Sequence, residues 1–220
     1  MMGLAELDKE DLVLNIYADL VFYGNAANEM LSKQIADDIA LHWNEPAAVV
    51  EVKQQWYKVN FIIHGFYSPA LTDIEVYENT DPKRNYFRIE EYASGNISFV
   101  DGINCNTGYF KLDNLLNNST TAAHEFGHTL GLDHPEILDI RGTATPGIMY
   151  PRGTIVDPPF QYDPNAAPGE KGGTLNPFAR KVLIQDIEDL HLSKLPFNSD
   201  GRAIVGEFSS VWHDAHIQPV

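Results

Sequence analysis

The amino-acid sequence predicts one compact domain of the mixed α/β (α+β) class that spans residues 1–220. Runs rich in β-branched and aromatic residues alternate with two stretches of helical periodicity, which indicates that strands and helices share one chain. With 220 residues and 44% hydrophobic side chains, the chain can bury a substantial core. No internal repeat is visible, which excludes solenoid and propeller architectures.

The first third of the chain predicts a central strand, a helix behind it and a strand pair. Residues 12–22 are apolar and β-prone, which is typical of a central strand. Asn25 can cap the next segment, residues 26–43, and Pro46 ends it, so we expect a helix there. The apolar stripe expected on this helix comprises Met30, Ile35, Ile39 and Leu41. The two strands that follow, joined by a short polar connection, are residues 49–52 and 56–66.

The middle of the chain predicts three short strands and a second helix. The helix runs to about residue 130, and Asn118, Ser119 or Thr120 can cap its start. The three strand candidates are residues 85–92, 96–102 and 107–114.

The last third of the chain predicts a long loop and a final helix. Residues 151–177 are rich in Pro, Gly and Asp, which favours a loop. Asn176 and Pro177 suit the start of a long helix over residues 176–192. Residues 203–208 read as a short strand or a packed strap. The apolar stripe expected on the last helix comprises Phe178, Val182, Leu183, Ile187 and Leu190.

The stretch HEFGHTLGLDH, residues 124–134, carries the chemistry of this sequence. His124 and His128 are one helical turn apart, so both imidazoles can reach one metal ion. Gly131 can end the helix at positive φ, after which the chain turns and His134 can supply a third nitrogen. Three protein ligands leave a fourth position for water, which is the pattern of a catalytic zinc site.

Glu125 follows the first histidine and points to the flank of the metal, where it can reach a metal-bound water without being a ligand. Zinc lowers the pKa of its bound water to roughly 7, and a neighbouring carboxylate can take the proton as the water attacks a carbonyl. The pattern therefore predicts amide hydrolysis, with a peptide bond as the expected substrate. A bare HExxH occurs by chance in many helices, but the longer pattern is far more specific.

The extended motif, together with the sequence GIMYP fifteen residues after His134, resembles the metzincin metalloproteases and their matrixin branch in particular. The resemblance is strong over residues 119–151 and rests on element order elsewhere. It implies a twisted mixed sheet with one antiparallel edge strand, a backing helix, the zinc-binding helix and a C-terminal helix. It also implies an upper subdomain of about residues 10–131 and a lower one of about 132–220.

The same resemblance implies roles for residues around the zinc ligands. Met149 is expected in a turn beneath the three histidines, as a hydrophobic floor and not a ligand. Tyr150 and Pro151 are expected to form a wall of the pocket for the residue after the scissile bond. An edge strand along the rim of the cleft would bind substrate through main-chain hydrogen bonds. The residues assigned to that strand are Gly108 to Leu112, with Gly108, Tyr109 and Phe110 as substrate contacts.

The sequence also departs from matrixins, whose histidine- and aspartate-rich loops have no clear counterpart between Trp56 and Asn114. We therefore expect one catalytic Zn²⁺ and no other cofactor. Four aspartates lie in turn-like contexts where Ca²⁺ could bind, but they form no dense oxygen-ligand pattern. They are Asp101, Asp113, Asp157 and Asp163.

The whole chain also resembles peptidase domains at the C-terminal ends of bacterial polymorphic toxins of the repeat-rich secreted class. The segments that carry this resemblance are YADLVFYGNAANE, SFVDGINCNTGYFKLDN and MYPRGTIVDPPFQYDPNAAPG. It implies delivery outside the producing cell with a larger carrier, and a cognate inhibitor or immunity protein. The first residues carry acids where a secretory signal has a basic region, so we expect another export route, with a cytosolic protein or a trimmed chain as alternatives.

Composition narrows the expected partners. The net charge of −16 disfavours nucleic acid and anionic membranes, and no apolar run is long enough for a membrane span. Cys105 is the single cysteine, so no internal disulfide can form. We expect a monomeric zinc endopeptidase acting on proteins or peptides. Two alternatives stay open, a toxin or effector protease with a narrow target and a catalytically inactive, zinc-dependent binding module.

Overall fold

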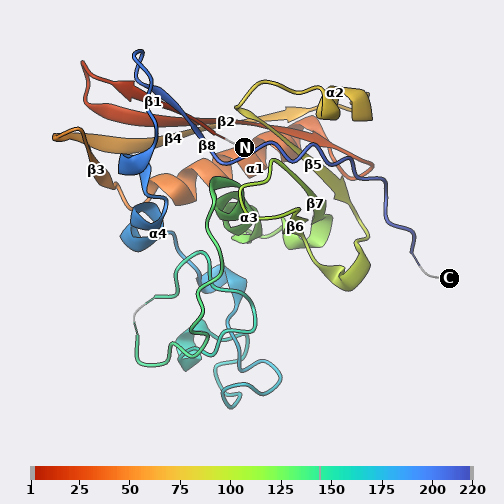
Figure 1. The fold of residues 1–220 in the computed structure, drawn as a ribbon. Coiled ribbons are helices and arrows are strands. Elements are labelled where there is room, and N and C mark those ends of the chain that lie inside the picture. Colours follow the sequence, from red (N-terminus) through yellow and green to blue (C-terminus); the bar gives the residue numbers. More distant parts are fainter. Residues whose placement is uncertain (1–2, 144, 219–220) are drawn as a thin grey trace.

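The computed structural model describes residues 3–143 and 145–218 and shows a mixed α/β fold with a curled, mixed sheet (Figure 1). Residues 1–2 and 219–220 of the expected domain, and residue 144 of its loop, lie outside the described residues. The strands are β1 (Gly3–Asp8), β2 (Val13–Tyr23), β3 (Val49–Val52), β4 (Gln55–Tyr67), β5 (Arg84–Glu90), β6 (Phe99–Val100), β7 (Thr107–Lys111) and β8 (Arg202–Val205). The α-helices are α1 (Glu29–Asn44), α2 (Asp73–Tyr77), α3 (Thr121–Leu130) and α4 (Ile184–Asp189). One-turn 3-10 helices occupy Ser94–Asn96, Leu112–Asn114, Pro158–Phe160, Pro177–Ala179 and Leu192–Lys194.

Strand β2 is the centre of the sheet, as its apolar sequence predicts. It pairs in parallel with β4 and β5, and the main order is β3-β4-β2-β5-β7-β6. The first half of β2 also pairs antiparallel with β1, which in turn pairs with β8. The sequence analysis missed β1, because GLAELD places only small or single apolar residues on its buried face. The expectation of one antiparallel edge strand is wrong, since β1, β3, β6 and β8 all pair antiparallel.

The strand at the rim of the sheet is β6, and this corrects the expectation that Gly108–Leu112 forms the edge. Strand β7 pairs in parallel with β5 on one side and antiparallel with β6 on the other. The turn between β6 and β7 includes Asn104 at positive φ, which folds the chain back on itself. Within the segment 96–102, expected as a short strand, β6 pairs with β7 and forms the edge.

Helix α1 begins one turn later than expected, and it buries Ile35 and Ile39 of the expected stripe but not Met30 and Leu41. Its N-cap is Asn28, whose side chain accepts the Leu31 N–H at 2.9 Å, and not Asn25. Met30 and Leu41 are 78% and 69% exposed, which corrects the expected stripe. The residues that α1 buries follow a true helical period and comprise Leu31, Ile35, Ala36, Ile39 and Trp43.

The main hydrophobic core lies between one face of the sheet and the helices α1 and α3. Alternate residues of β2 point into it, as the burial pattern of that strand shows. Trp43 joins the two helices, because its indole contacts the ring of Phe126 and its Nε1 donates to the Ala123 carbonyl at 3.0 Å. Helix α3, which carries the histidine motif, is thereby held against α1 (Figure 1).

The expected long C-terminal helix over residues 176–192 is broken into pieces. Asn176 does cap Phe178, but residues 180–183 are extended, and only α4 is a true α-helix. The Lys181 N–H donates to the Pro146 carbonyl at 3.0 Å, so this stretch forms a bridge with the segment before Met149. Phe178, placed on the expected stripe, is 51% exposed. Tertiary hydrogen bonds have overridden a helical pattern here.

The lower part of the molecule consists of loops that hang beneath α3 (Figure 1). Residues 151–176 form the expected loop, and Ile140, Val156 and Leu175 give it a small core of its own. Strand β1 lies before residue 10, and β8, near the end of the chain, pairs with it in the upper sheet. Among the described residues, no helix has the length and apolarity that a bilayer crossing requires.

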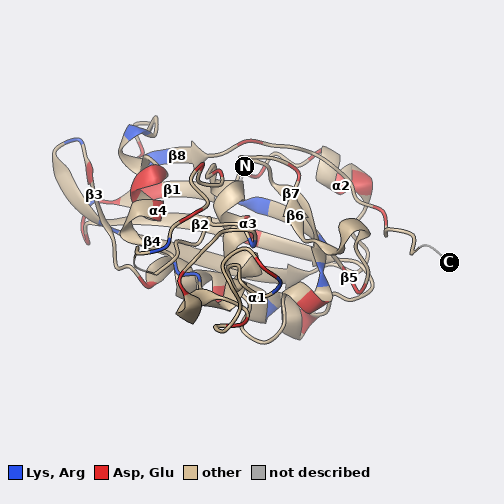
Figure 2. Ribbon diagram, turned by 90° about the horizontal axis from the view of Figure 1, so that it is seen from below, with Lys and Arg blue, Asp and Glu red and all other residues tan. Residues whose placement is uncertain are grey.

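Acidic residues are spread over helices and loops of the molecule (Figure 2), in keeping with the net charge of −16. Residues 206–218 run back across the outer face of the sheet. There Trp212 stacks on Tyr23 with ring centroids 4.7 Å apart. His213 Nε2 lies 3.0 Å from Asp101, and His216 stacks on Tyr109 at 4.0 Å. Residues 203–208, expected as a strand or a strap, thus supply both β8 and the start of this strap.

We expect Trp43→Phe to lower the free energy of unfolding by about 1–3 kcal/mol, because it removes a buried hydrogen bond and leaves a void. Urea unfolding measures the change. Trp56→Phe is the matched control, since Trp56 is 58% exposed and should change stability by less than about 0.5 kcal/mol. Equal stability of the two variants would contradict a role for Trp43 in joining α1 to α3.

Candidate metal centre

Helix α3 presents the histidine motif from the middle of the fold, and all ten of its residues are buried. It starts after Thr120, whose side chain makes no capping bond; the Ser119 hydroxyl accepts the Thr121 N–H instead, at 3.2 Å. It ends at Gly131, which has φ of 109°, as the sequence predicts. The Leu132 N–H bonds back to the Gly127 carbonyl at 3.0 Å, which turns the chain toward His134.

Two backbone carbonyls orient the first two histidines. His124 Nδ1 lies 2.7 Å from the Ile148 carbonyl oxygen, and His128 Nδ1 lies 2.7 Å from that of Leu132. A carbonyl oxygen can only accept, so each Nδ1 carries the proton. The Nε2 atoms of both rings are therefore unprotonated in the neutral side chains, with lone pairs free to bind a metal ion.

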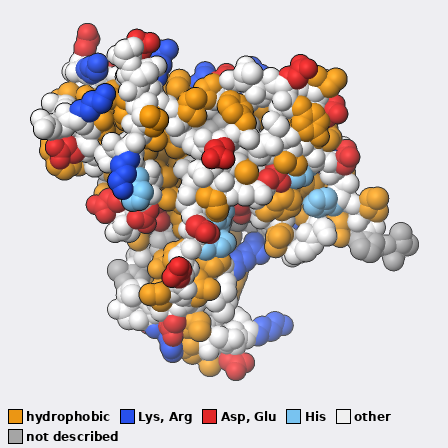
Figure 3. All heavy atoms as spheres, viewed as in Figure 1, with side chains coloured by type: hydrophobic (Ala, Val, Ile, Leu, Met, Phe, Trp, Pro, Cys, Tyr) orange, Lys and Arg blue, Asp and Glu red, His pale blue; other side chains and the backbone are white. Residues whose placement is uncertain are grey.

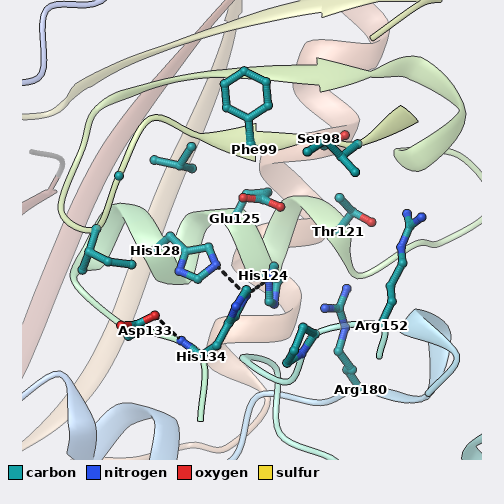
Figure 4. A pocket seen from close by; sticks show the side chains of 15 residues that line it. Ser98, Phe99, Thr121, His124, Glu125, His128, Asp133, His134, Arg152 and Arg180 are labelled. Carbon is teal, nitrogen blue, oxygen red and sulfur yellow. Dashed lines mark hydrogen bonds between the residues drawn. The ribbon is translucent and has the colours of Figure 1, made fainter. Parts of the chain in front are cut away.

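The three imidazoles converge on one point (Figure 4). His134 Nε2 lies 3.1 Å from the Nε2 atoms of both His124 and His128. Burial is the main cause that lowers the pKa of all three rings, that of His124 most, and neighbouring histidines lower the pKa of His124 and His128 further. The cluster is thus a set of neutral nitrogen donors.

These donors fit a metal ion. Among the described residues, His124, His128 and His134 are the group of potential ligands that the structure brings together, with their ligand atoms within 4.8 Å of one another. Neutral imidazole nitrogens suit zinc, copper, iron and nickel and do not suit Ca²⁺. His134 is exposed while the other two are buried, so the centre opens to the surface on one side. The sequence predicted all three members of this group.

Met149 packs against the face of α3 below the histidines, as the resemblance implies. It is 3% exposed. A Cβ added to Gly127 would overlap its sulfur and come within 3.2 Å of Trp43. Gly127 is therefore the position at which the methionine sulfur reaches the helix backbone, and the sequence analysis did not single it out.

A buried carboxylate supports the turn that carries Met149. Asp186 accepts the Leu183 N–H at 2.7 Å and also faces the N–H of Ile148. Because the carbonyl of Ile148 holds His124, Asp186 acts on the first histidine through a single residue, Ile148. Burial raises the pKa of Asp186 to about 6, and the backbone N–H groups oppose that rise only in part.

Glu125 lies deep in the site beside the histidines. It is 7% exposed, and burial raises the pKa of its carboxyl to about 8. The positive charges of Arg180 and Arg152 and the N–H of Val100 in β6 act in the opposite direction. Its carboxyl group faces the cleft between α3 and β6 (Figure 4). This is the flanking position that the sequence predicts for a group acting on bound water.

The histidines and Glu125 line a cleft of about 410 Å³. The rest of its lining comes from residues 97–100 and 102–103 around β6, from Thr121 and Asp133, and from Pro151, Arg152 and Arg180. Figure 3 shows this hollow between the upper sheet and the lower loops, with histidine and basic side chains at its edge.

The predicted substrate contacts divide into two groups. Pro151 lines the cleft, as expected. Tyr150 does not; its side chain packs on the small lower core, and its carbonyl accepts Arg180 Nη1 at 3.0 Å. The remaining predicted contacts lie one strand away from the cleft in β7 and are buried, which corrects their assignment. They are Gly108, Tyr109 and Phe110.

The sequence did not predict the residues that line the cleft in place of Gly108, Tyr109 and Phe110. Ser98, Phe99 and Val100 line the cleft, but the segment 96–102 offered only a strand pattern. Arg180 lay inside an expected helix, where a single basic residue reads as solvent-exposed. Its burial depends on the break in that helix. No local signal could have found it.

We expect Gly127→Ala to weaken metal binding by at least tenfold. Ala is ordinarily the better helix former by about 1 kcal/mol, but here its methyl group must displace the sulfur of Met149 from beneath the histidines. Competition with a chromophoric chelator measures the affinity. Ala122→Gly serves as the control for helix propensity, because it lowers the propensity of the same helix where Gly127→Ala raises it. Unchanged affinity in Gly127→Ala would contradict the packing argument.

Asp186 should make stability depend on pH. Its folded pKa of about 6 exceeds the ordinary value of 3.8, so the unfolded chain releases this proton first. Stability therefore falls as pH rises from about 4 to 6, by on the order of 3 kcal/mol at 1.36 kcal/mol per unit. Asp186→Asn should remove that slope, and Asp189→Asn, at an exposed neighbour, should keep it. Urea unfolding between pH 3.5 and 7.5 tests this, and equal slopes in both variants would refute it.

No protein-family model matches this chain, and a search of curated proteins finds no match. The metal centre is therefore defined by its own geometry, as three neutral imidazoles and a buried carboxyl group on the floor of an open cleft.

Proposed function

We propose that the protein is a zinc-dependent endopeptidase, with His124, His128 and His134 as the zinc ligands and Glu125 as the general base. The observation that carries the proposal is the convergence of the Nε2 atoms of three histidines next to a buried carboxyl group in a cleft. The metzincin-like motif and the methionine beneath the histidines support it.

Zinc is the metal that this ligand set suits best among redox-inactive ions. Three imidazole ligands with an open position match catalytic zinc sites, whereas structural sites use four protein ligands. When bound, zinc supplies a Lewis acid that makes a coordinated water acidic near neutral pH and polarises a substrate carbonyl. The Ile148 and Leu132 carbonyls keep the two helical histidines in the tautomer that binds it.

Glu125 has the position and the acidity of a proton shuttle. Its side chain does not take part in the histidine cluster, yet it comes from the same turn of α3. A carboxyl group whose pKa lies near neutrality can accept a proton from the attacking water and return it to the leaving amine. Burial keeps bulk water from competing for that proton.

The rim of the cleft suits a polypeptide. Strand β6 pairs with β7 on one side, and the described residues give it no strand partner on the other. An extended peptide could pair with this free edge and lie across the histidines, as in other cases of β-strand addition. The proposal thus moves the main-chain role expected of β7 to the free edge of β6.

Glu125→Gln should lower the rate of peptide cleavage by about 10²–10⁴-fold, because it removes the general base, while zinc affinity stays within a few-fold. Cleavage of a peptide library by the zinc-loaded protein, followed by mass spectrometry, measures the rate. Glu136→Gln is the control, since Glu136 is exposed and lies outside the cleft. If the wild-type protein with stoichiometric zinc cleaves no peptide and Glu125→Gln changes nothing, the chain is a zinc-binding module.

A further inference from the structure

The cleft carries a concentration of positive charge that the proposed hydrolysis does not use. Arg180 and Arg152 lie on one side of His124, next to Thr121, while Asp133 and His128 lie on the other side (Figure 4). Both arginines line the cleft, in a protein with 31 acidic and only 15 basic residues.

Arg180 is a buried cation whose hydrogen bonds go to neutral groups. It is 4% exposed. Its Nε donates to the Thr120 hydroxyl at 3.0 Å, and Nη1 donates to the Tyr150 carbonyl at 3.0 Å. A guanidinium has five N–H donors, so these bonds leave donors free, including both on Nη2. Among the described residues no carboxylate forms an ion pair with Arg180.

Arg152 adds a second charge on the same side of His124 (Figure 4). It follows Pro151 in the chain, it is exposed, and its Nη2 donates to the Asn114 amide oxygen at 3.1 Å. It too forms no ion pair with the residues that the structure describes. Burial lowers the pKa of Arg180 to about 10; the negative charge of Glu125 opposes this effect and the positive charge of Arg152 adds to it, and Arg180 is still charged at neutral pH.

Other arginines of the chain form ion pairs with carboxylates. Arg88 pairs with Glu90 at 2.6 Å, and Arg141 pairs with Asp139 at 2.6 Å. A buried charge without a counter-ion is costly, and a fold tolerates it where a ligand supplies the opposite charge. Thr121, at the first turn of α3, brings the positive end of the helix to the same place.

We propose that Arg180 and Arg152 form a carboxylate-binding subsite, so that the preferred substrate is a polypeptide with a carboxylate next to the bond to be cleaved. This rests on the proposed function only in taking a polypeptide as the ligand. The carboxylate belongs to an Asp or Glu side chain or to a free C-terminus; both present the same two oxygens to the fork of Arg180. The overall negative charge of the protein disfavours the binding of acidic substrate segments to other parts of its surface, so such segments bind at this subsite.

The first test measures binding without cleavage. The zinc-loaded Glu125→Gln protein is titrated with acetylated, amidated hexapeptides that carry one Asp, Asn or Lys at each position in turn. We expect the Asp peptide to bind about tenfold or more tighter than the Asn peptide at one position only. The same peptides with a free C-terminal carboxylate distinguish the two sources of the charge. Equal binding of Asp, Asn and free-acid peptides would overturn the proposal.

The second test changes the charge of the subsite. Arg152→Gln in the same background should reduce the Asp-to-Asn ratio several-fold, and Arg152→Glu should reverse the preference in favour of Lys. Arg141→Gln is the control, because Arg141 pairs with Asp139 outside the cleft. Arg180→Gln also removes bonds to Thr120 and Tyr150, so Arg152 carries the test if that variant does not fold. An unchanged ratio in Arg152→Glu would refute the subsite.

Cleavage by the wild-type protein separates this inference from the proposed function. Cleavage at positions without any acidic enrichment would overturn the subsite and leave the endopeptidase in place. Acid-selective binding with no cleavage of any peptide would overturn the endopeptidase and support the subsite. An absence of both binding and cleavage would overturn both.

Discussion

Two hydrogen bonds, from the Nδ1 atoms of His124 and His128 to backbone carbonyls, determine what the histidine cluster can do. They place the ring protons on the far side of each imidazole and leave the Nε2 lone pairs facing His134. Both carbonyls belong to chain that follows α3, at Leu132 and Ile148. The positions of Leu132 and Ile148 therefore decide whether the three histidines can face one metal ion.

Several buried polar groups hold the residues around Ile148 in place, and burying each of these groups lowers the stability of the fold. Asp186 supports Ile148 with a carboxyl group whose pKa is raised by burial, and Arg180 links Thr120 to Tyr150 with an unpaired charge. Hydrophobic residues of similar size would stabilise such positions better. Polar groups such as Asp186 and Arg180 surround the histidines because directional hydrogen bonds fix the orientation of the imidazole rings. Apolar packing alone would leave the rings free to turn.

In the functions that we propose, the edge of the sheet and the two arginines recognise different parts of the substrate. A free strand edge at β6 offers main-chain hydrogen bonds that any extended peptide can use. Arg180 and Arg152 add a charge requirement on one side of the histidines. The target protein and the route of delivery remain predictions that rest on the resemblance to secreted toxin peptidases.

The sequence by itself determined the features that depend on neighbouring residues. Helical spacing of His124 and His128 and the turn at Gly131 are local, so the metal ligands, Glu125 and the central strand were all predictable. Only the tertiary structure decided which residues line the cleft. Whether β6 or β7 forms the edge depends on pairing between distant strands, and Arg180 is buried because residues 180–183 bond to the segment before Met149 instead of continuing a helix. Such long-range hydrogen bonds outweigh local propensity and leave no periodic signal in the chain.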